Sequence, residues 1–183
     1  MKTNLVRNIT ALVVLVTMFS SCAKEVELTP ITPGAGDGEE PTVVIIANKI
    51  NKDSLLLLVN ETRAKGCNCG GVQMAPVGNV TWNDLLEYAA VKHSKDMSDN
   101  NYFNHNSRNG ATPGARLDAV GYRWNAYAEN IAKGPKDAAA VIAGWIKSPD
   151  HCKNLMNGSF KEMGVGRYNE YWTQEFGVIN NPK

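Results

Sequence analysis

The stretch 162-EMGVGRYNEYWTQEFGVI-179 decides the fold class. It contains two strand-like runs, Glu162–Tyr168 and Tyr171–Ile179, separated by Asn169-Glu170, a pair that suits a tight hairpin. The chain before it carries mainly helical patterns. Helices followed by a terminal antiparallel hairpin predict an α+β domain built in layers.

Five helices are expected before the hairpin, each from a capping or proline signal at its start and a stop signal at its end. The signals that start them are Asp53-Ser54, the capping-box-like Thr81-Trp82-Asn83-Asp84, Thr112-Pro113, Pro135 and Ser148-Pro149. They end near Lys65, before Asn100, and near Gly121, Lys147 and Asn157-Gly158. The connection from Cys67 to Val80 is expected to be a loop, and Tyr122 to Ala132 shows no clear period.

The first 21 residues are expected to be a signal peptide. Lys2 and Arg7 form a positive region, and the apolar run at 9–19 is too short to span a bilayer. The run ends in "FSSC", which resembles a relaxed bacterial lipobox. Cys22 is therefore expected to be lipidated and to become the new N-terminus. An ordinary signal peptide cut near Ser21 is the alternative.

Residues 22–50 are expected to be the lipidated cysteine and a flexible tether, with the folded domain at 51–183. The stretch 23–42 is rich in proline, glycine and acidic residues, so it buries too little apolar surface to fold. The run "VVIIA" at 43–47 is either an edge strand or a docking segment. Removing residues 1–21 changes the net charge from +1 to −1, which gives no electrostatic reason to expect a nucleic-acid partner.

Three of the four cysteines remain once Cys22 is lipidated. Cys67 and Cys69 are too close in sequence to bridge each other without strain. An exported protein lies in an oxidising compartment, so Cys152 is expected to form a disulfide with one of them. A metal site formed by Cys67, Cys69 and Cys152 with a histidine is the alternative.

Histidine and glutamate residues supply the candidate site. His151 is the third residue of its expected helix, where the positive helix terminus favours neutral imidazole and Ser148 can cap the backbone N–H of His151. His151 cannot easily activate Cys152, because neighbouring helical residues point about 100° apart. His105 lies in a polar loop, and Glu129 lies among small and apolar residues. His105, Glu129 and His151 could form a zinc site with an open position.

A third histidine is expected to be structural. His93 falls on the apolar stripe of the second helix, whose members are Leu85, Leu86, Ala89, Ala90, His93 and Met97. A lone histidine on such a stripe is usually a core residue.

Six segments in order resemble the CAP superfamily, the cysteine-rich secretory protein family, and especially its bacterial lipoprotein branch. They are "AAVKHSKDM", "NYFNHNSRNGATPGARLDAVGY", "AENIA", "GWIKSPDHCKNLM", "EMGVGRY" and "YWTQEFG". The resemblance covers about residues 55–178. It implies an α-β-α sandwich, in agreement with the helices and the terminal hairpin.

The resemblance also implies a groove lined by two histidines and two acidic residues, which in some members binds zinc or another divalent cation. By motif position the two histidines are His105 and His151, and the first acidic residue is Glu129. Ser148 stands where the second acidic residue would be, and this departure disfavours a mechanism that needs two carboxylates. Tyr127 and Asn154 are implied as further groove-lining residues.

These observations predict an exported, membrane-anchored protein of the bacterial cell envelope, either periplasmic or on the outer surface. Its groove is expected to bind a divalent metal ion together with a lipid, peptide or cell-wall ligand. The alternatives are a metal-assisted hydrolase acting on peptide or cell-wall glycan and a non-catalytic adhesion module. The missing second acid and the lack of a well-placed nucleophile favour binding.

Overall fold

A four-stranded sheet forms the middle layer of the domain in the computed structural model, which describes residues 46–179. The strand order is β3-β5-β6-β4, with bounds Thr81–Trp82, Glu162–Tyr168, Tyr171–Ile179 and Trp124–Lys133. β5 and β6 form the predicted hairpin, in which Tyr168 pairs with Tyr171 and Asn169 adopts a φ of 54°. β4 pairs antiparallel with β6, and the short β3 runs parallel to β5.

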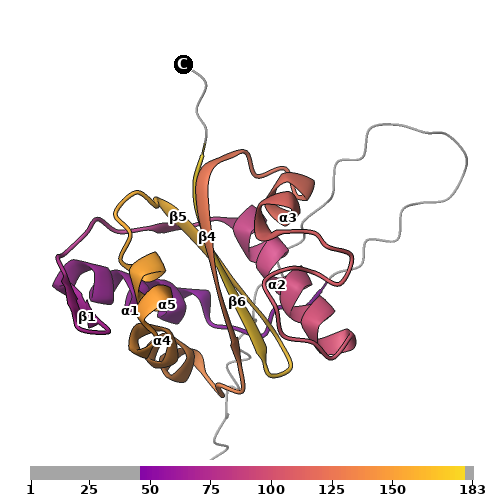
Figure 1. The fold of residues 1–183 in the computed structure, drawn as a ribbon, viewed down its shortest axis with the longest axis horizontal. Coiled ribbons are helices and arrows are strands. Elements are labelled where there is room, and N and C mark those ends of the chain that lie inside the picture. The colour runs from indigo at the N-terminus through magenta and orange to yellow at the C-terminus, as the bar shows by residue number, and fades with distance from the viewer. Residues whose placement is uncertain (1–45, 180–183) are drawn as a thin grey trace, which may run out of the picture.

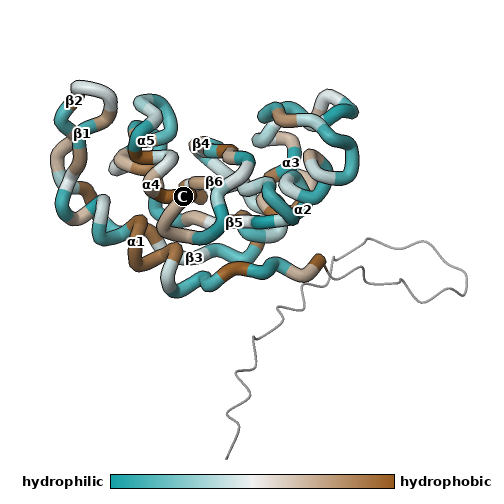
Figure 2. Tube along the Cα trace, turned by 90° about the horizontal axis from the view of Figure 1, so that it is seen from below, coloured by the Kyte–Doolittle hydropathy of each residue, from teal (hydrophilic) through white to brown (hydrophobic). Residues whose placement is uncertain are grey.

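Helices cover both faces of this sheet, as the predicted α-β-α sandwich requires (Figures 1 and 2). On one side lie α1, α4 and α5, with bounds Lys52–Lys65, Ala138–Lys147 and Pro149–Leu155. On the other side lie α2 and α3, with bounds Asp84–Asp99 and Pro113–Ala119. No helix within 46–179 is both long enough and apolar enough to cross a membrane.

Alternation along β6 assigns its side chains to the two faces. Trp172 and Phe176 are buried in the core beneath α1, α4 and α5. Thr173 faces α2, where its hydroxyl accepts a hydrogen bond from Ser94 at 2.9 Å. Glu175 follows Thr173 at the same parity and is fully buried on that face. A glutamate therefore lies buried between the sheet and α2.

Two glycines let α2 approach the sheet closely. A Cβ at Gly164 would lie 2.1 Å from the backbone nitrogen of Glu87, and a Cβ at Gly166 would lie 2.1 Å from that of Val91. Both contacts are with helix backbone, which cannot swing aside. Any side chain at either glycine would therefore push α2 away from the sheet.

Arg63 is a fully buried cation on α1. Its guanidinium donates hydrogen bonds to the backbone carbonyls of four residues: Gly78 at 2.7 Å, Leu155 at 2.7 Å, Asn157 at 3.1 Å and Phe160 at 3.3 Å. These carbonyls lie near the end of α5 and in the loops beside it, and burial would leave those of Leu155 and Phe160 without a donor. Arg63 thus joins α1 to the end of α5.

Three helix starts differ from the sequence prediction. Asn51, rather than Asp53-Ser54, caps α1 by accepting from the backbone N–H of Ser54. Asn83 caps α2, because Thr81 and Trp82 are extended and pair with β5. α4 begins at Ala138 behind the cap Asp137, three residues later than the Pro135 start expected from sequence.

Two connections contain strands that the sequence did not predict. The expected loop after α1 contains a small antiparallel hairpin, β1 at Cys67–Cys69 and β2 at Val72–Met74. The aperiodic stretch after α3 contains most of β4.

The N-terminal expectations fall mostly outside the described residues. The signal peptide, Cys22, most of the tether and residues 43–45 lie there. Ile46 and Ala47 have no regular structure, so the described end of the 43–47 run is not a strand. Asn48 contacts β5, since its side chain donates to the carbonyl of Val165 at 2.9 Å and accepts from the N–H of Arg167 at 2.9 Å.

Candidate functional site

The candidate site is centred on Glu129, whose side chain on β4 is almost completely buried. One carboxylate oxygen, Oε1, accepts a hydrogen bond from Nδ1 of His105 at 2.7 Å. The other, Oε2, accepts from Nη2 of Arg116. The structure thus brings together two of the residues predicted from sequence, His105 and Glu129, and adds an arginine that the sequence analysis did not identify.

This arrangement sets the tautomer of His105. Because the carboxylate accepts from Nδ1, the ring carries its proton there, and Nε2 of the neutral ring keeps a free lone pair. The His105 side chain is half exposed, with a relative accessibility of 50%. His105 can therefore offer Nε2 to a ligand while Glu129 holds the ring from behind.

Arg116, on α3, organises the loop that carries His105. Its Nη1 donates to the carbonyls of His105 at 2.9 Å and Ala111 at 3.2 Å, and to the hydroxyl of Ser107 at 3.3 Å. The same guanidinium also bonds Glu129. One side chain thus fixes both partners of the His105–Glu129 pair. The "TPGAR" start of α3 provided a sequence signal, because it places an arginine in a short helix directly after the polar loop.

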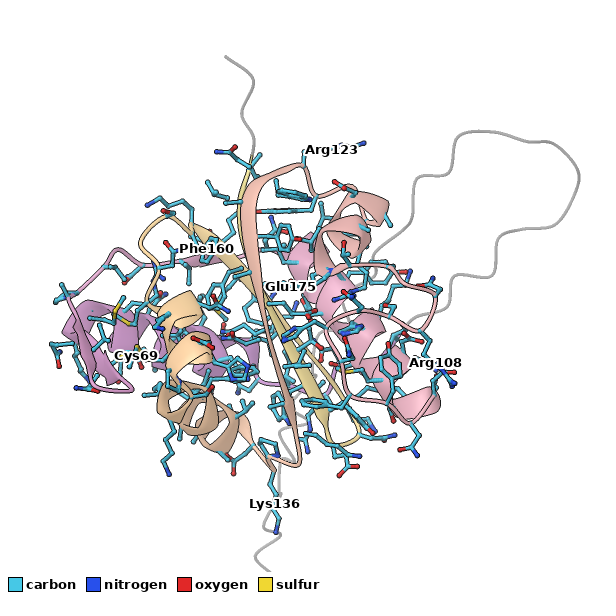
Figure 3. The ribbon with its side chains drawn as sticks, viewed as in Figure 1. Cys69, Arg108, Arg123, Lys136, Phe160 and Glu175 are labelled. Carbon is cyan, nitrogen blue, oxygen red and sulfur yellow. A yellow bond between two sulfur atoms is a disulfide. The ribbon has the colours of Figure 1, made fainter. Side chains whose placement is uncertain are left out.

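A second carboxyl group lies behind the first. Glu175 on β6 is the register partner of Glu129 on β4 and has no exposed surface. Its Oε1 lies 3.8 Å from Nη2 of Arg116, and among the described residues neither carboxyl oxygen has a hydrogen-bond partner of ordinary geometry. Figure 3 shows Glu175 near the centre of the sheet. Glu175 is therefore a second acidic residue beside Glu129, but it has no surface open to solvent and does not replace the acidic groove residue missing at Ser148.

The pKa values of Glu129 and Glu175 are shifted in opposite directions. Burial raises the pKa of Glu175 well above its ordinary value, and the negative charge of Glu129 raises it further. Burial also acts to raise the pKa of Glu129, but the hydrogen bond from His105 and the charge of Arg116 outweigh it, so this pKa is lowered. These shifts favour the carboxylate form of Glu129 and the protonated form of Glu175.

His93 is buried, as expected from the helical stripe, but it also contacts the site. Its Nε2 lies 3.0 Å from the carbonyl oxygen of Asn104 and 3.9 Å from Oε2 of Glu129. Burial lowers the pKa of His93 despite the nearby Glu129 charge, which favours the neutral ring. The purely structural interpretation of His93 was therefore incomplete.

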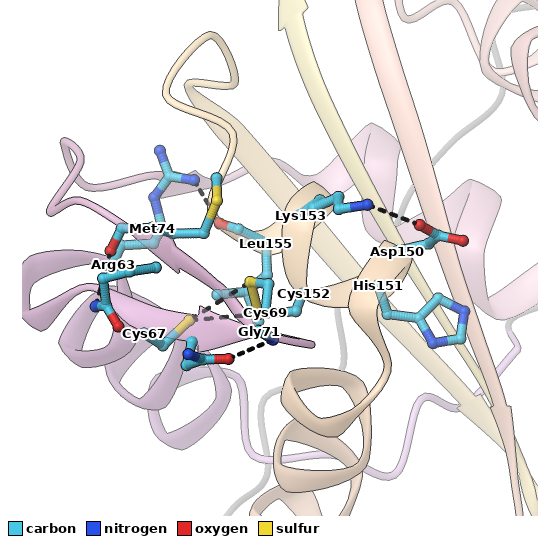
Figure 4. The surroundings of a disulfide bond; sticks show 12 residues. Arg63, Cys67, Cys69, Gly71, Met74, Asp150, His151, Cys152, Lys153 and Leu155 are labelled. Carbon is cyan, nitrogen blue, oxygen red and sulfur yellow. Dashed lines mark hydrogen bonds and ion pairs between the residues drawn. A yellow bond between two sulfur atoms is a disulfide. The ribbon is translucent and has the colours of Figure 1, made fainter.

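His151 lies on α5, on the other side of β4 from the His105 loop. Burial lowers its pKa, and the proximity of His105 lowers it further, so the neutral ring is favoured. Figure 4 shows its ring projecting from α5 toward the strands and away from Cys152. The Ser148 side chain makes no capping hydrogen bond, so the expected Ser148-to-His151 cap is wrong.

The three predicted ligands do not form one compact cluster. Within residues 46–179, the donor atoms of His105, Glu129 and His151 do not all lie within 4.8 Å of one another. Glu129 also has both oxygens engaged, by His105 and Arg116. The histidines are thus the more exposed donors, and Glu129 supports one of them.

The other two predicted lining residues have packing partners. Asn154 on α5 donates to the side-chain oxygen of Asn130 at 2.9 Å, which ties α5 to β4. Tyr127 packs edge-on against Trp124, with ring centroids 4.6 Å apart, and its ring covers Gly114 on α3. Both residues flank Glu129 and fix the elements on either side of it.

The expected disulfide forms between Cys69 and Cys152, and Cys67 is a free thiol. The sequence left the choice between Cys67 and Cys69 open. In Figure 3, Cys69 lies at the side of the domain beside α1 and α5, away from Glu175.

The sequence matches the family model described as "CAP: Cysteine-rich secretory protein family" over residues 56–179. The chain belongs to the CAP family. Two Bacillus subtilis proteins are similar to it. The uncharacterized protein YkwD is 36% identical over 96 residues, covering 51% of this chain and 37% of the relative. The uncharacterized membrane protein YlbC is 34% identical over 100 residues, covering 55% of this chain and 29% of the relative. The chain thus matches only about a third of each relative's length.

Solved structures agree with this assignment. An extracellular protein of Bacillus anthracis containing an SCP domain superposes with a TM-score of 0.62 at 34% identity, covering 68% of this chain and 39% of that one. An outer surface protein of Borrelia burgdorferi superposes with a TM-score of 0.60 at 22% identity, covering 70% of this chain and 92% of that one. The second likeness concerns the fold alone. The CAP assignment and the sandwich fold predicted from sequence are thus confirmed.

Proposed function

We propose that this protein is an exported binding protein whose groove holds a divalent metal ion, most favourably zinc, between His105 and His151. The observation that carries the proposal is the bond from Nδ1 of His105 to buried Glu129. It leaves Nε2 as the free donor, and a histidine whose other nitrogen bonds a carboxylate is a common zinc ligand. The lowered pKa of His151 favours the neutral ring that ligation requires.

The donor set fits zinc in its chemistry. His105 and His151 would hold the ion, Glu129 would orient His105, and the remaining positions would be open to water or ligand. A bound ion would act as a Lewis acid toward an oxygen of a lipid, peptide or cell-wall ligand. Because the three donor atoms are not clustered, the His151 ring would approach His105 when the ion binds.

Binding is favoured over hydrolysis by the position of the second acid. A hydrolase needs a proton donor that reaches the leaving group. Glu175 is the acid whose raised pKa favours the protonated form, but it has no exposed surface. Ser148 cannot replace a carboxylic acid. Metal-assisted hydrolysis of peptide or glycan, and a purely adhesive role, are therefore the outcomes against which binding is tested.

Export and anchoring complete the proposal. The signal-like residues 1–21 and the "FSSC" stretch support lipidation at Cys22. The likeness to an extracellular Bacillus anthracis protein supports a place in the bacterial envelope. Intact-mass measurement of the mature protein should find a diacylated Cys22 at its N-terminus, and a mature start at another residue would contradict the anchor.

Zinc titration calorimetry tests the groove. The wild type should bind zinc, and His105→Ala and His151→Ala should each abolish tight binding. Glu129→Gln should weaken it about 10- to 100-fold, because it removes the charge behind His105. Affinity should fall as the pH drops through about 6, since protonated imidazole cannot ligate. Glu61→Gln, on the exposed surface of α1, is the control.

Two results separate the proposal from its alternatives. Equal zinc affinity in the wild type and the His105→Ala/His151→Ala double variant would reject the metal groove. The other result is cleavage of peptidoglycan or of a peptide library by the wild type. If a chelator stopped this cleavage and the double variant lacked it, hydrolysis would replace binding as the proposed function.

A further inference from the structure

A second cluster of possible metal ligands lies away from the groove. The three-sulfur cluster consists of Cys67, Cys69 and Cys152. The Sγ atom of Cys67 lies 3.4 Å from that of Cys152 and 3.8 Å from that of Cys69. Within 46–179 it is the one group of three such side chains whose donor atoms all lie within 4.8 Å of each other. The proposed groove function uses none of them.

The fold places these sulfurs together in a specific way. Cys67 and Cys69 alternate with Asn68 along β1, so their side chains leave the strand on the same face. The turn after β1 packs against the start of α5, where a Cβ on Gly70 would lie 2.5 Å from the ring of Pro149. This contact fixes the hairpin beside α5 and brings Cys152 opposite β1 (Figure 4).

The third sulfur is not needed for the disulfide. The Cys69–Cys152 bridge alone ties the hairpin to α5, and both of its residues are fully buried. Cys67 is half-buried and faces the bridge from the accessible side. Burial raises the pKa of the Cys67 thiol, so it remains protonated beside the closed bridge. The position of the Cys67 thiol beside the Cys69–Cys152 bridge is explained if all three sulfurs bind one ligand after the bridge is reduced.

The sulfur spacing suits a thiolate metal site. Three thiolates around a tetrahedral zinc ion at about 2.3 Å are separated by roughly 3.8 Å. The distances from Cys67 to the other two sulfurs, 3.4 Å and 3.8 Å, already approach this value. Only Cys69 and Cys152 would have to separate. His151 faces away from the cluster, so the fourth position is left to water or an external ligand.

We propose that the three-sulfur cluster is a redox-gated site for a thiophilic metal ion such as zinc. An external dithiol supplies two electrons and two protons, which opens the Cys69–Cys152 bridge to two thiols while the dithiol becomes a disulfide. Zinc then binds Cys67, Cys69 and Cys152 as thiolates and releases their three protons. Oxidation by an external disulfide reverses the reaction and expels the metal. Either state fastens the β1–β2 hairpin to α5.

Cobalt and zinc titrations of the full mature chain test this proposal. The protein is compared in its oxidised form and after anaerobic reduction with a phosphine, which competes little for the metal. The reduced wild type should bind one more metal equivalent than the oxidised form. Cobalt should then show thiolate-to-metal charge-transfer absorption, which imidazole ligands do not give.

Two variants make the result specific. Cys67→Ser leaves the bridge intact, so its oxidised form should unfold at the wild-type temperature, yet reduced Cys67→Ser should bind cobalt at least about tenfold more weakly, or about 1.4 kcal/mol. His105→Ala/His151→Ala should keep the charge-transfer band, so failure of the groove and failure of the cluster are distinguishable.

Three outcomes would overturn the proposal. The first is no additional metal equivalent on reduction. The second is an unchanged cobalt band and affinity in reduced Cys67→Ser. The third is a bridge that moves from Cys69–Cys152 to Cys67–Cys152 without metal binding, which would make the cluster a disulfide-exchange device.

Discussion

The buried acid pair predicts a stabilising substitution at a core glutamate. Glu175→Gln replaces a carboxyl group, whose pKa burial raises well above its ordinary value, with an amide of the same shape. Because the amide has no proton to lose in the unfolded chain, the variant should be more stable than the wild type at neutral pH.

The magnitude follows from proton linkage. The folded pKa of Glu175 is raised above the ordinary value of 4.5, so its contribution to stability is fully present below that value and is lost as the pH rises. Each pH unit over which the folded acid keeps a proton that the unfolded chain has released costs about 1.4 kcal/mol. Between pH 5 and pH 7 the advantage of the variant should grow by up to about 3 kcal/mol.

Urea denaturation from about pH 4.5 to about pH 7.5 measures this difference. The two proteins should have similar free energies of unfolding at the acid end and diverge as the pH rises. The variant itself should lose stability as the pH falls, for two reasons. Burial lowers the folded pKa of His93. The contacts with His105 and Arg116 lower the folded pKa of Glu129. Glu170→Gln, at an exposed carboxylate in the same hairpin, is the matched control.

A pH-independent difference between Glu175→Gln and the wild type would refute the reasoning. So would a variant that is less stable at neutral pH. Either result would mean that Glu175 is ionised in the folded protein and paired with Arg116.

Three further predictions concern packing and cross-links, each measured by denaturant unfolding. Gly166→Ala should lower the free energy of unfolding by about 3 kcal/mol or more, because its Cβ meets α2 backbone. Gly144→Ala, on the exposed face of α4 with open space around it, should be neutral or should raise that free energy by up to about 1 kcal/mol. Arg63→Met should lower the free energy of unfolding by about 3–5 kcal/mol, because four carbonyls, two of them in buried hydrogen bonds, lose their donor. Cys152→Ser should cost about 4.5 kcal/mol in the chain-entropy model for a bridge spanning 83 residues; a loss below about 1 kcal/mol would mean that the unfolded chain gains little freedom.

Local signals predicted the helices and the terminal hairpin well. Capping residues, apolar stripes and a two-residue turn depend on near neighbours, and the β5–β6 bounds match the expected runs. β4 was missed because its central residues are polar. Glu129 and Asn130 are buried only because His105, Arg116 and Asn154 reach them from elsewhere in the chain. No local period encodes such partners.

The site was predicted in part for the same reason. The bond between His105 and Glu129 agrees with their expected convergence. Glu175 was missed because its place in an alternating strand resembles a solvent-facing position. α2 covers that face because Gly164 and Gly166 admit it closely. Arg63 did carry a signal, since it continues the four-residue spacing of the buried Leu55 and Val59 on α1.

Arg63 has a consequence for how this domain can change its sequence. Its four acceptors are backbone carbonyls, and a carbonyl is the same whichever residue carries it. In the segments around Gly78 and from 155 to 160, exposed positions such as Asn157 and Ser159 are therefore free to exchange side chains without losing the link to α1, provided the segment lengths and backbone paths are kept. Leu155 and Phe160, by contrast, are held by the core. The cation itself has no such freedom, because lysine cannot reach four carbonyls with a planar fork. Substitutions should thus accumulate around Arg63 more readily than insertions, and new surface properties can arise at this end of the domain without disturbing the centre of the fold.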